Sequence, residues 1–301
     1  MKTAVAFIVF KRPAVTCQVL AAIRTAQPPM LFVIADGPRA GKMEEADKCI
    51  QVRRVIEEGV DWPCEVVKIY ADKNLGCARR VSSGLDEVFR RVEEAIILED
   101  DCLPHPTFFP FCETLLERYR DDERVAQIAG CNFFPESFKA VTESYCFSRY
   151  PHCWGWATWR RAWRHYDHEM RSWKTAREAG WKLPVERPGE CVVWAGCFDA
   201  VSRGALDSWA YRWTASLWAC GALSITSAQN LVTNIGFGDD ATHTTGGIWG
   251  NRALGSAHFP LLHPAAVSRN EAADALTGRL VFEPPSIFRR ILRFCRRLLG
   301  L

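Results

Sequence analysis

Short apolar runs rich in β-branched residues alternate with longer amphipathic stretches through the first hundred residues. The apolar runs span residues 4–10, 31–35, 65–70 and 95–98. In the stretches between them, apolar side chains recur at spacings of three and four, as they do in amphipathic helices. These stretches are residues 15–26, 43–58 and 78–92. The alternation predicts successive strand–helix–strand units, and therefore an α/β fold with a mostly parallel sheet flanked by helices.

The second half of the chain lacks this regular alternation over much of its length and is rich in tryptophan. A fourth helix is predicted from Pro106 to about residue 120, and a further strand at residues 125–129. Ten of the twelve tryptophans then fall between Trp154 and Trp218, and clear periodicity returns only at residues 207–217. For Trp156, Trp159 and Trp163 the spacing favours core packing, although tryptophan faces can also stack on sugar rings.

The composition is that of an ordinary folded protein, with 48% hydrophobic and 24% charged residues in a chain of 301. A net charge of +3 gives no argument for nucleic acid as a partner. Thirteen cysteines without a Cys-x-x-Cys pair indicate reduced thiols. No run of 18 uncharged apolar residues is present, and the first apolar run leads directly into Lys11 and Arg12 without a cleavage site. These features predict a cytoplasmic protein.

Three consecutive carboxylates, Glu99, Asp100 and Asp101, follow the fourth apolar run and precede Pro104. Three adjacent like charges repel one another, so a positive partner is expected among them. Carboxylate oxygens are the ligands that Mg²⁺ and Mn²⁺ prefer. A solvated acidic turn is the alternative, but the position directly after a buried strand favours a metal site.

Other polar residues follow the remaining predicted strands. In parallel sheets ligands bind beyond the carboxyl ends of the strands, where these residues are expected to meet. Arg12 follows the first strand and suits a diphosphate, or is a surface arginine before Pro13. Asp36 ends the second strand in an Asp-Gly-Pro turn, and a turn role is its alternative. Asn74 and Arg79 stand at the start of the third helix, where phosphates bind readily.

A family resemblance rests on four segments. They are residues 7–13 (Phe-Ile-Val-Phe-Lys-Arg-Pro), 35–39 (Ala-Asp-Gly-Pro-Arg), 74–76 (Asn-Leu-Gly) and 98–101 (Leu-Glu-Asp-Asp). Together they resemble bacterial family 2-like glycosyltransferases of the GT-A (Rossmann-like) fold, and they are similar to N-acetylglucosaminyltransferase I, whose metal motif is likewise Glu-Asp-Asp. The resemblance covers most of residues 4–245 and includes Trp-Gly-Trp-Ala-Thr-Trp at 154–159.

The resemblance implies transfer of a hexosyl or N-acetylhexosaminyl group from a nucleotide-diphosphate sugar, expected to be a UDP-sugar, to a hydroxyl of a glycan or lipid-linked acceptor. Mn²⁺ or Mg²⁺ is the implied cofactor. Arg12 would contact phosphate, Asp36 the uracil, and Asp101 the metal. The resemblance also places Glu99 and Asp100 near the ribose and the sugar. The usual Asp-x-Asp is replaced by Glu-Asp-Asp, so which carboxylates besides Asp101 contact the metal stays open. Asn74 and Arg79, at the start of the third helix, complete the expected donor-binding residues.

The resemblance also implies a catalytic base. In the related enzyme an aspartate before a tryptophan-containing helix has this role, and Asp207 lies in that context in Ala-Leu-Asp-Ser-Trp at 205–209. Asp199 is the second choice. A single displacement assisted by such a base inverts the anomeric carbon. His243, in a loop of sequence Gly-Phe-Gly-Asp-Asp-Ala-Thr-His, is a candidate for the metal or the diphosphate, or a structural histidine.

These assignments divide the chain into three parts. Residues 1–135 are expected to bind the nucleotide-sugar, residues 136–283 to form the acceptor-binding and catalytic half of the same domain, and residues 284–301 to form a basic amphipathic tail. On a helical projection, five arginines of this tail gather opposite an apolar face. This arrangement predicts binding to an anionic membrane surface on the inner membrane face, with packing on the domain as the alternative.

Two rival functions fit parts of the same pattern. A nucleotide- or carbohydrate-binding protein without turnover would keep the fold, but the presence of both Asp101 and Asp207 argues against it. A metal-dependent nucleotidyltransferase would also use acidic strand ends. Sugar-activating nucleotidyltransferases need a glycine-rich loop soon after the first strand, and Lys11-Arg12-Pro13 contains no glycine.

Overall fold

The predicted alternation of strands and helices is present in the computed structural model, which describes residues 1–237 and 252–282. Each of the first four strands begins and ends within one residue of its predicted limits. The strands of this half are β1 (Ala4–Val9), β2 (Met30–Ala35), β3 (Glu65–Tyr70), β4 (Glu94–Glu99), β5 (Cys102–Pro104) and β6 (Val125–Ala129). The helices are α1 (Pro13–Ala26), α2 (Met43–Gly59), α3 (Cys77–Arg91) and α4 (Phe108–Arg118).

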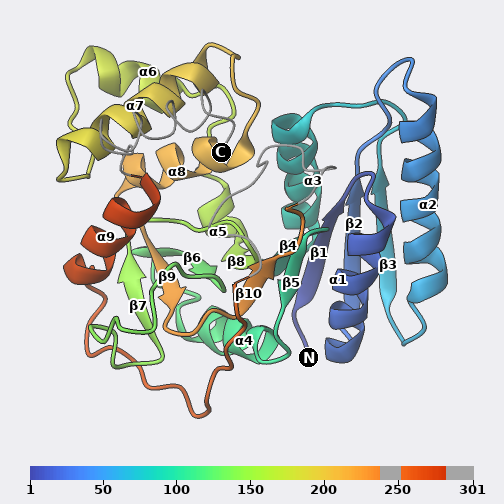
Figure 1. Cartoon of the computed structure of the whole chain (residues 1–301), viewed down its shortest axis with the longest axis horizontal. Coiled ribbons are helices and arrows are strands. Elements are labelled where there is room, and N and C mark those ends of the chain that lie inside the picture. Colours follow the sequence, from blue (N-terminus) through green and yellow to red (C-terminus); the bar gives the residue numbers. More distant parts are fainter. Residues whose placement is uncertain (238–251, 283–301) are drawn as a thin grey trace, which may run out of the picture.

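The second half adds strands to the same sheet and a group of helices above it (Figure 1). Its strands are β7 (Tyr145–Ser148), β8 (Trp156–Trp159), β9 (Leu223–Ser227) and β10 (Val232–Asn234). Its helices are α5 (Arg160–Trp163), α6 (Arg171–Glu178), α7 (Pro188–Ser202), α8 (Trp209–Cys220), α9 (Glu271–Thr277) and a π-helical turn, η1 (Gly278–Phe282). Of these elements, only α8 corresponds to a periodic stretch of the sequence, the one at residues 207–217.

The main sheet has eight strands in the order β3-β2-β1-β4-β8-β6-β9-β7. β1 pairs in parallel with β2 and β4, and β2 with β3, as the strand–helix alternation predicts. β8 is antiparallel to both of its neighbours, and β7 is antiparallel to β9. The sheet is therefore mostly parallel and takes strands from both sides of residue 135, which confirms the predicted fold class.

Helices cover both faces of the sheet. One core forms where α1, α2 and α4 pack on one face, and a second forms where α3, α5 and α8 pack on the other. Alternate residues of β1 enter the two cores: Val5 and Phe7 enter the first, and Ala6 the second. Such strands are buried on both faces, which explains why they are continuous apolar runs in the sequence.

Buried tryptophans lie in the cores on both faces of the sheet and in a third core. Trp156 and Trp159 lie on opposite faces of β8, as residues three apart in a strand do, and both are buried. Trp163 is buried in α5, so core packing is confirmed for all three. The third core, which includes Trp173, joins α6, α7 and α8. Within the described residues, no helix is both long and apolar enough to cross a bilayer.

Candidate functional site

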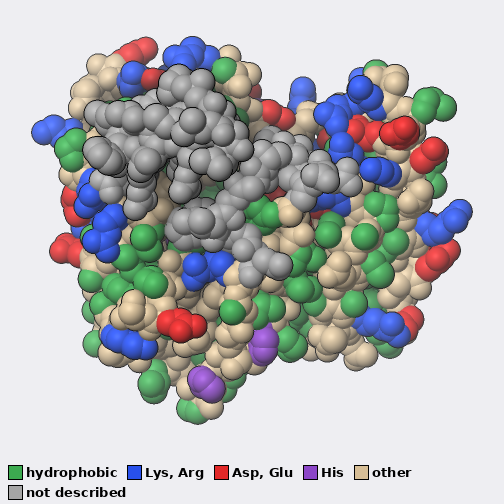
Figure 2. Space-filling view, in the orientation of Figure 1, with side chains coloured by type: hydrophobic (Ala, Val, Ile, Leu, Met, Phe, Trp, Pro, Cys, Tyr) green, Lys and Arg blue, Asp and Glu red, His purple; other side chains and the backbone are tan. Residues whose placement is uncertain are grey.

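The carboxyl ends of β1, β2 and β4 meet at one edge of the sheet. The register pairs Val9 with Ala35 and Ile8 with Glu99, so the residues that follow these strands are brought together. They are the three predicted groups Arg12, Asp36 and the Glu99–Asp101 triplet. In the space-filling view, basic and acidic side chains mingle over this edge, above the ends of β1–β3 (Figure 2).

Arg12 connects the end of β1 to the acidic triplet. Its Nη2 donates to Oδ1 of Asp100 and to Oδ2 of Asp101, the latter at 2.9 Å. The backbone N–H of Phe10 donates to the other Asp100 oxygen at 3.2 Å. Asp100 is thus buried and bonded through both oxygens to the segment that follows β1, while Asp101 retains more exposure.

The charges at this edge do not balance. Three carboxylates lie close together, and among the described residues Arg12 is the cation that bonds to them. Burial, reinforced by Asp101 and Asp100, raises the pKa of Glu99 to about 8. Burial also raises the pKa of Asp100 to about 6, against the opposing effect of Arg12. For Arg12 itself, burial lowers the pKa, but the two aspartates raise it above its ordinary value. The edge therefore favours a further positive charge.

The three carboxylates at this edge meet some of the requirements of a site for a hard divalent cation. The clustered carboxylate oxygens are of the right kind for Mg²⁺ or Mn²⁺, and the excess negative charge is of the right sign. In residues 1–237 and 252–282, however, no group of three or more His, Cys, Asp or Glu side chains is arranged to hold a metal. A metal at this edge would be held mainly by Asp101, which keeps more exposure than Asp100.

The short ribbon of β5 and β10 closes the site on the side of the second half. Asn234 pairs with Cys102, and Ile235 N–H donates to the carbonyl of Asp101 at 2.8 Å. This pairing brings Gly236 against the acidic cluster. A Cβ at residue 236 would lie 2.5 Å from both Nη1 of Arg12 and Oδ2 of Asp101. Only a residue without a side chain fits this position unless the cluster moves.

Asp36 holds two loops together. It is 6% exposed, and its oxygens accept from the backbone N–H of Gly37 and of Leu75, each at 2.9 Å. Asn74 donates its side-chain amide to Asp36 Oδ2 and to the carbonyl of Gly37, each at 3.0 Å. The predicted pair Asp36 and Asn74 is therefore in direct contact. Next to it lies a hollow of about 540 Å³, between residues 38–46 and residues 72–74.

Arg80, which the sequence analysis did not select, is the buried basic residue of the α3 start. Arg79 is exposed, whereas Arg80 is 7% exposed and its Nε has no hydrogen-bond partner among the described residues. Burial lowers the pKa of Arg80, and the charge of Asp36 opposes this effect. A helical projection gives no signal that separates the two arginines, because about 100° per residue places both well away from the apolar stripe of α3, at similar angles on either side of it.

Asp207 reaches the start of α3 from the segment before α8. Its Oδ1 accepts from the backbone N–H of Ala78 at 3.1 Å. Gly76, with φ of +83°, allows this approach, because a Cβ there would lie 2.7 Å from Asp207 Oδ2. Burial raises the pKa of the Cys77 thiol to about 12, and the charges of Glu99 and Asp207 both add to this rise.

Of the other two candidates, Asp199 is not at this edge. Asp199 lies in α7 and contacts α6, where Trp173 Nε1 donates to it at 3.1 Å and Arg177 pairs with it at 2.9 Å. His243 lies outside the described residues. The structure therefore brings together Arg12, the acidic triplet, Asp36 with Asn74, and Asp207, the last of these from more than a hundred residues away in the chain.

The chain matches no protein-family model and no curated protein sequence. Solved structures with some similarity include a mannosyltransferase from Pyrobaculum calidifontis in complex with GDP-Man and Mn²⁺, with 15% identity and a TM-score of 0.36 over 52% of this chain and 44% of that chain. Another is S. aureus TarS 1–349, with 9% identity and a TM-score of 0.37 over 53% and 47%. A third is UDP-glucose pyrophosphorylase complexed with UDP-glucose, with 10% identity and a TM-score of 0.32 over 55% and 79%. The chain spans less than half the length of the first two, and similarities this low assign neither a substrate nor a mechanism.

Proposed function

We propose that this chain is a metal-assisted, inverting glycosyltransferase that uses a nucleotide-diphosphate sugar, with UDP as the favoured nucleotide. One observation carries the proposal. Arg12 and the triplet Glu99–Asp101 form a charged cluster with excess negative charge at the strand ends, the same edge of the sheet that carries the hollow formed by residues 38–46 and 72–74. A diphosphate with its cation suits the cluster, and a nucleoside suits the hollow.

Each donor-side residue then has a defined part. Arg12 would leave the aspartates to bind a diphosphate oxygen, and Asp101 would hold the cation. Asp36 would act by fixing the loop at Asn74 and Leu75, since both of its oxygens already accept hydrogen bonds from that loop or from Gly37. We add Arg80 to the expected donor-binding residues in preference to the exposed Arg79, because Arg80 is a buried cation near Asp36.

Asp207 is the proposed base. An acceptor hydroxyl attacks C1 of the sugar, the new bond forms on the face opposite to the leaving diphosphate, and the hydroxyl proton passes to the Asp207 carboxylate. The N–H of Ala78 orients this carboxylate, which is exposed and therefore open to an acceptor. A divalent cation would stabilise the charge that develops on the diphosphate. Arg12 would add a second positive charge to the same group.

The proposal is tested by calorimetric titration of UDP, GDP and dTDP, and of their sugars, with and without Mn²⁺. We expect one nucleotide to bind at least about tenfold more tightly with Mn²⁺, which corresponds to about 1.4 kcal/mol. Asp101→Asn is expected to remove most of this metal dependence, because the carboxylate joins the protein to the cation. Asp121→Asn, a change of an exposed aspartate distant in sequence from the cluster, serves as the matched control.

Two results would contradict the proposal. Unchanged Mn²⁺ dependence in Asp101→Asn would remove Asp101 from the metal site. If no nucleotide or nucleotide-sugar binds under any condition, the function itself is wrong. Hydrolysis of one nucleotide-sugar by the wild-type chain, at a rate reduced in Asp101→Asn, would support the proposal independently of the unknown acceptor.

A further inference from the structure

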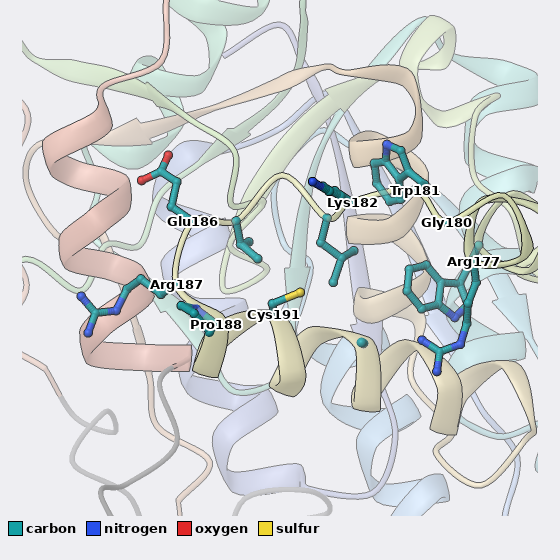
Figure 3. A pocket seen from close by; sticks show the side chains of 12 residues that line it. Arg177, Gly180, Trp181, Lys182, Glu186, Arg187, Pro188 and Cys191 are labelled. Carbon is teal, nitrogen blue, oxygen red and sulfur yellow. The ribbon is translucent and has the colours of Figure 1, made fainter.

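A second pocket lies in the helical group above the sheet, among α6, the segment 180–187 and the first turns of α7 (Figure 3). Its volume is about 420 Å³, within the usual range for small-ligand sites. Arg177 and Arg187 stand at its two ends, and Cys191 of α7 faces the segment that passes above the helix. No residue of this pocket belongs to the cluster at the strand ends.

Two tryptophans contribute flat apolar surface to the lining of this pocket. Trp173 is buried and fixed, because its Nε1 donates to Asp199 and its ring packs edge-on against Phe198. Trp181 is 37% exposed, which makes it one of the few exposed large hydrophobic side chains of the described structure. A lining that contains one exposed indole and one fixed indole is suited to a ring whose C–H face is apolar and whose edge is polar.

The charges of the pocket lining are predominantly positive. Arg177, Lys182 and Arg187 line it, and Glu186 is the single acidic residue among the lining side chains. Glu186 is already neutralised from outside the pocket, since it pairs with Arg149 at 3.1 Å and with Arg269 at 2.7 Å.

Lys182 is a basic residue of this lining whose charge is not neutralised by a salt bridge within the described chain. It is exposed, and it forms no salt bridge with the rest of the described chain. Arg177, by contrast, pairs with Asp199 of α7. The uncommitted ammonium group of Lys182, in a lining that has three basic side chains and one acidic one, favours a ligand with negative charge.

We propose that this pocket binds an acidic saccharide, with a sugar ring against the tryptophans and a carboxylate or other anionic substituent near Lys182. The charge and the aromatic surface come from the pocket itself, whereas the preference for a saccharide over other anions rests on the proposed glycosyltransferase function. The site is separate from the donor site and would hold a part of a glycan chain away from the reacting hydroxyl. If the pocket binds part of the acceptor in this way, the acceptor is an acidic glycan.

The test is direct binding, measured at low salt by calorimetry without nucleotide or metal. The probes are a hyaluronan hexasaccharide, which carries uronic acids, the neutral chitohexaose, and a hexaglutamate peptide. We expect the hyaluronan hexasaccharide to bind at least about tenfold more tightly than the other two probes. Trp181→Ala and Lys182→Ala should each weaken this binding about fivefold to tenfold.

Lys174→Ala is the matched control, because Lys174 is an exposed lysine of α6 that does not line the pocket. It should leave saccharide binding unchanged, and all three variants should bind UDP with Mn²⁺ as the wild type does. Absence of hyaluronan binding, or binding that survives both pocket variants, would overturn the inference. Equal binding of chitohexaose would overturn the acidic requirement, and equal binding of hexaglutamate would overturn the choice of a saccharide. Because UDP titration is a separate measurement, failure of this site and failure of the proposed function are distinguishable.

Discussion

At the residue scale, Asp207 joins the two halves of the chain through one hydrogen bond. The bond to Ala78 N–H holds the carboxylate at the start of α3, against Gly76. The N–H needs only an acceptor oxygen, which an asparagine side chain also provides. A proton acceptor for catalysis, however, requires the carboxylate. Substitution by asparagine therefore separates the structural role from the chemical one.

We expect Asp207→Asn to fold normally and to bind the donor with unchanged affinity, but to transfer sugar at least about 10²-fold more slowly, as loss of a general base does. Circular dichroism, UDP titration and a product assay check the three parts. Asp199→Asn provides the comparison, because its carboxylate is bonded to α6. Near-normal turnover in Asp207→Asn together with slow turnover in Asp199→Asn would reverse the assignment.

His152 is a buried residue with a pH-dependent contribution to stability. It is 6% exposed, it packs edge-on against Phe133 at 4.9 Å, and burial lowers its pKa from 6.5 to about 4. The unfolded chain then takes up a proton at a higher pH than the folded one. The neutral imidazole thus contributes fully to stability above about pH 6.5, and this contribution is lost as the pH falls towards 4.

The expected loss from His152 is on the order of 3 kcal/mol between pH 6.5 and 4. Urea unfolding of the wild type and of His152→Phe at several pH values in this window measures it, since phenylalanine keeps the ring packing without the titration. The free energy of unfolding should fall less steeply with decreasing pH in His152→Phe. Parallel pH profiles for the two proteins would show that His152 titrates normally.

At the element scale, α3 positions the site by packing closely on β2. Gly84 faces Ile34, and a Cβ at this position would clash with the Ile34 side chain. Gly196 offers a contrast in the middle of α7, where nothing lies within 4 Å of an added Cβ. Both glycines are inside helices, so the same substitution tests packing at one and backbone entropy at the other.

We expect Gly84→Ala to destabilise the protein by about 1–3 kcal/mol through overpacking. Gly196→Ala should stabilise it by about 0.5–1 kcal/mol, because alanine loses less backbone freedom on folding. Thermal and urea unfolding measure both. A stabilising Gly84→Ala would mean that α3 can move away from β2, and UDP affinity in that variant would then report whether the start of α3 matters for donor binding.

At the scale of the whole molecule, the proposed acceptor is a glycan or lipid-linked glycan, and the predicted tail would bring the enzyme to a membrane. The tail lies outside the described residues, so this part rests on the sequence. Five arginines between residues 289 and 297 stand opposite an apolar face on a helical projection. Each arginine near an anionic surface contributes about 1 kcal/mol, which is enough in sum for peripheral binding.

We expect the full chain to sediment with anionic liposomes at low salt and a chain ending at Glu283 to stay in the supernatant. Both chains should bind UDP equally. Liposomes of neutral lipid and a high-salt buffer serve as controls, because screening weakens the attraction of the arginines. A full-length protein that ignores anionic liposomes at low salt would leave packing on the domain as the role of the tail.

The acidic residues of the site were predictable because they follow directly from local pattern. Apolar runs of β-branched residues define β1, β2 and β4, and the carboxyl ends of parallel strands meet at one edge wherever the sheet forms. Arg12, Asp36 and the triplet at residues 99–101 therefore had to lie near one another once the strand–helix alternation was recognised.

Other parts of the site depend on contacts between distant segments, which local periodicity does not encode. The hydrogen bond from Ala78 to Asp207 spans 129 residues, and the β5–β10 pairing that brings Gly236 against Asp101 spans a similar interval. The burial of Arg80 and the pocket between α6 and α7 likewise arise only when helices pack together. Periodicity in a sequence reports which face of an element is buried, so it determined the strands, helices and strand-end carboxylates of the first half of the chain. Which distant face covers that surface depends on the packing of the whole chain, and only the tertiary structure decided it.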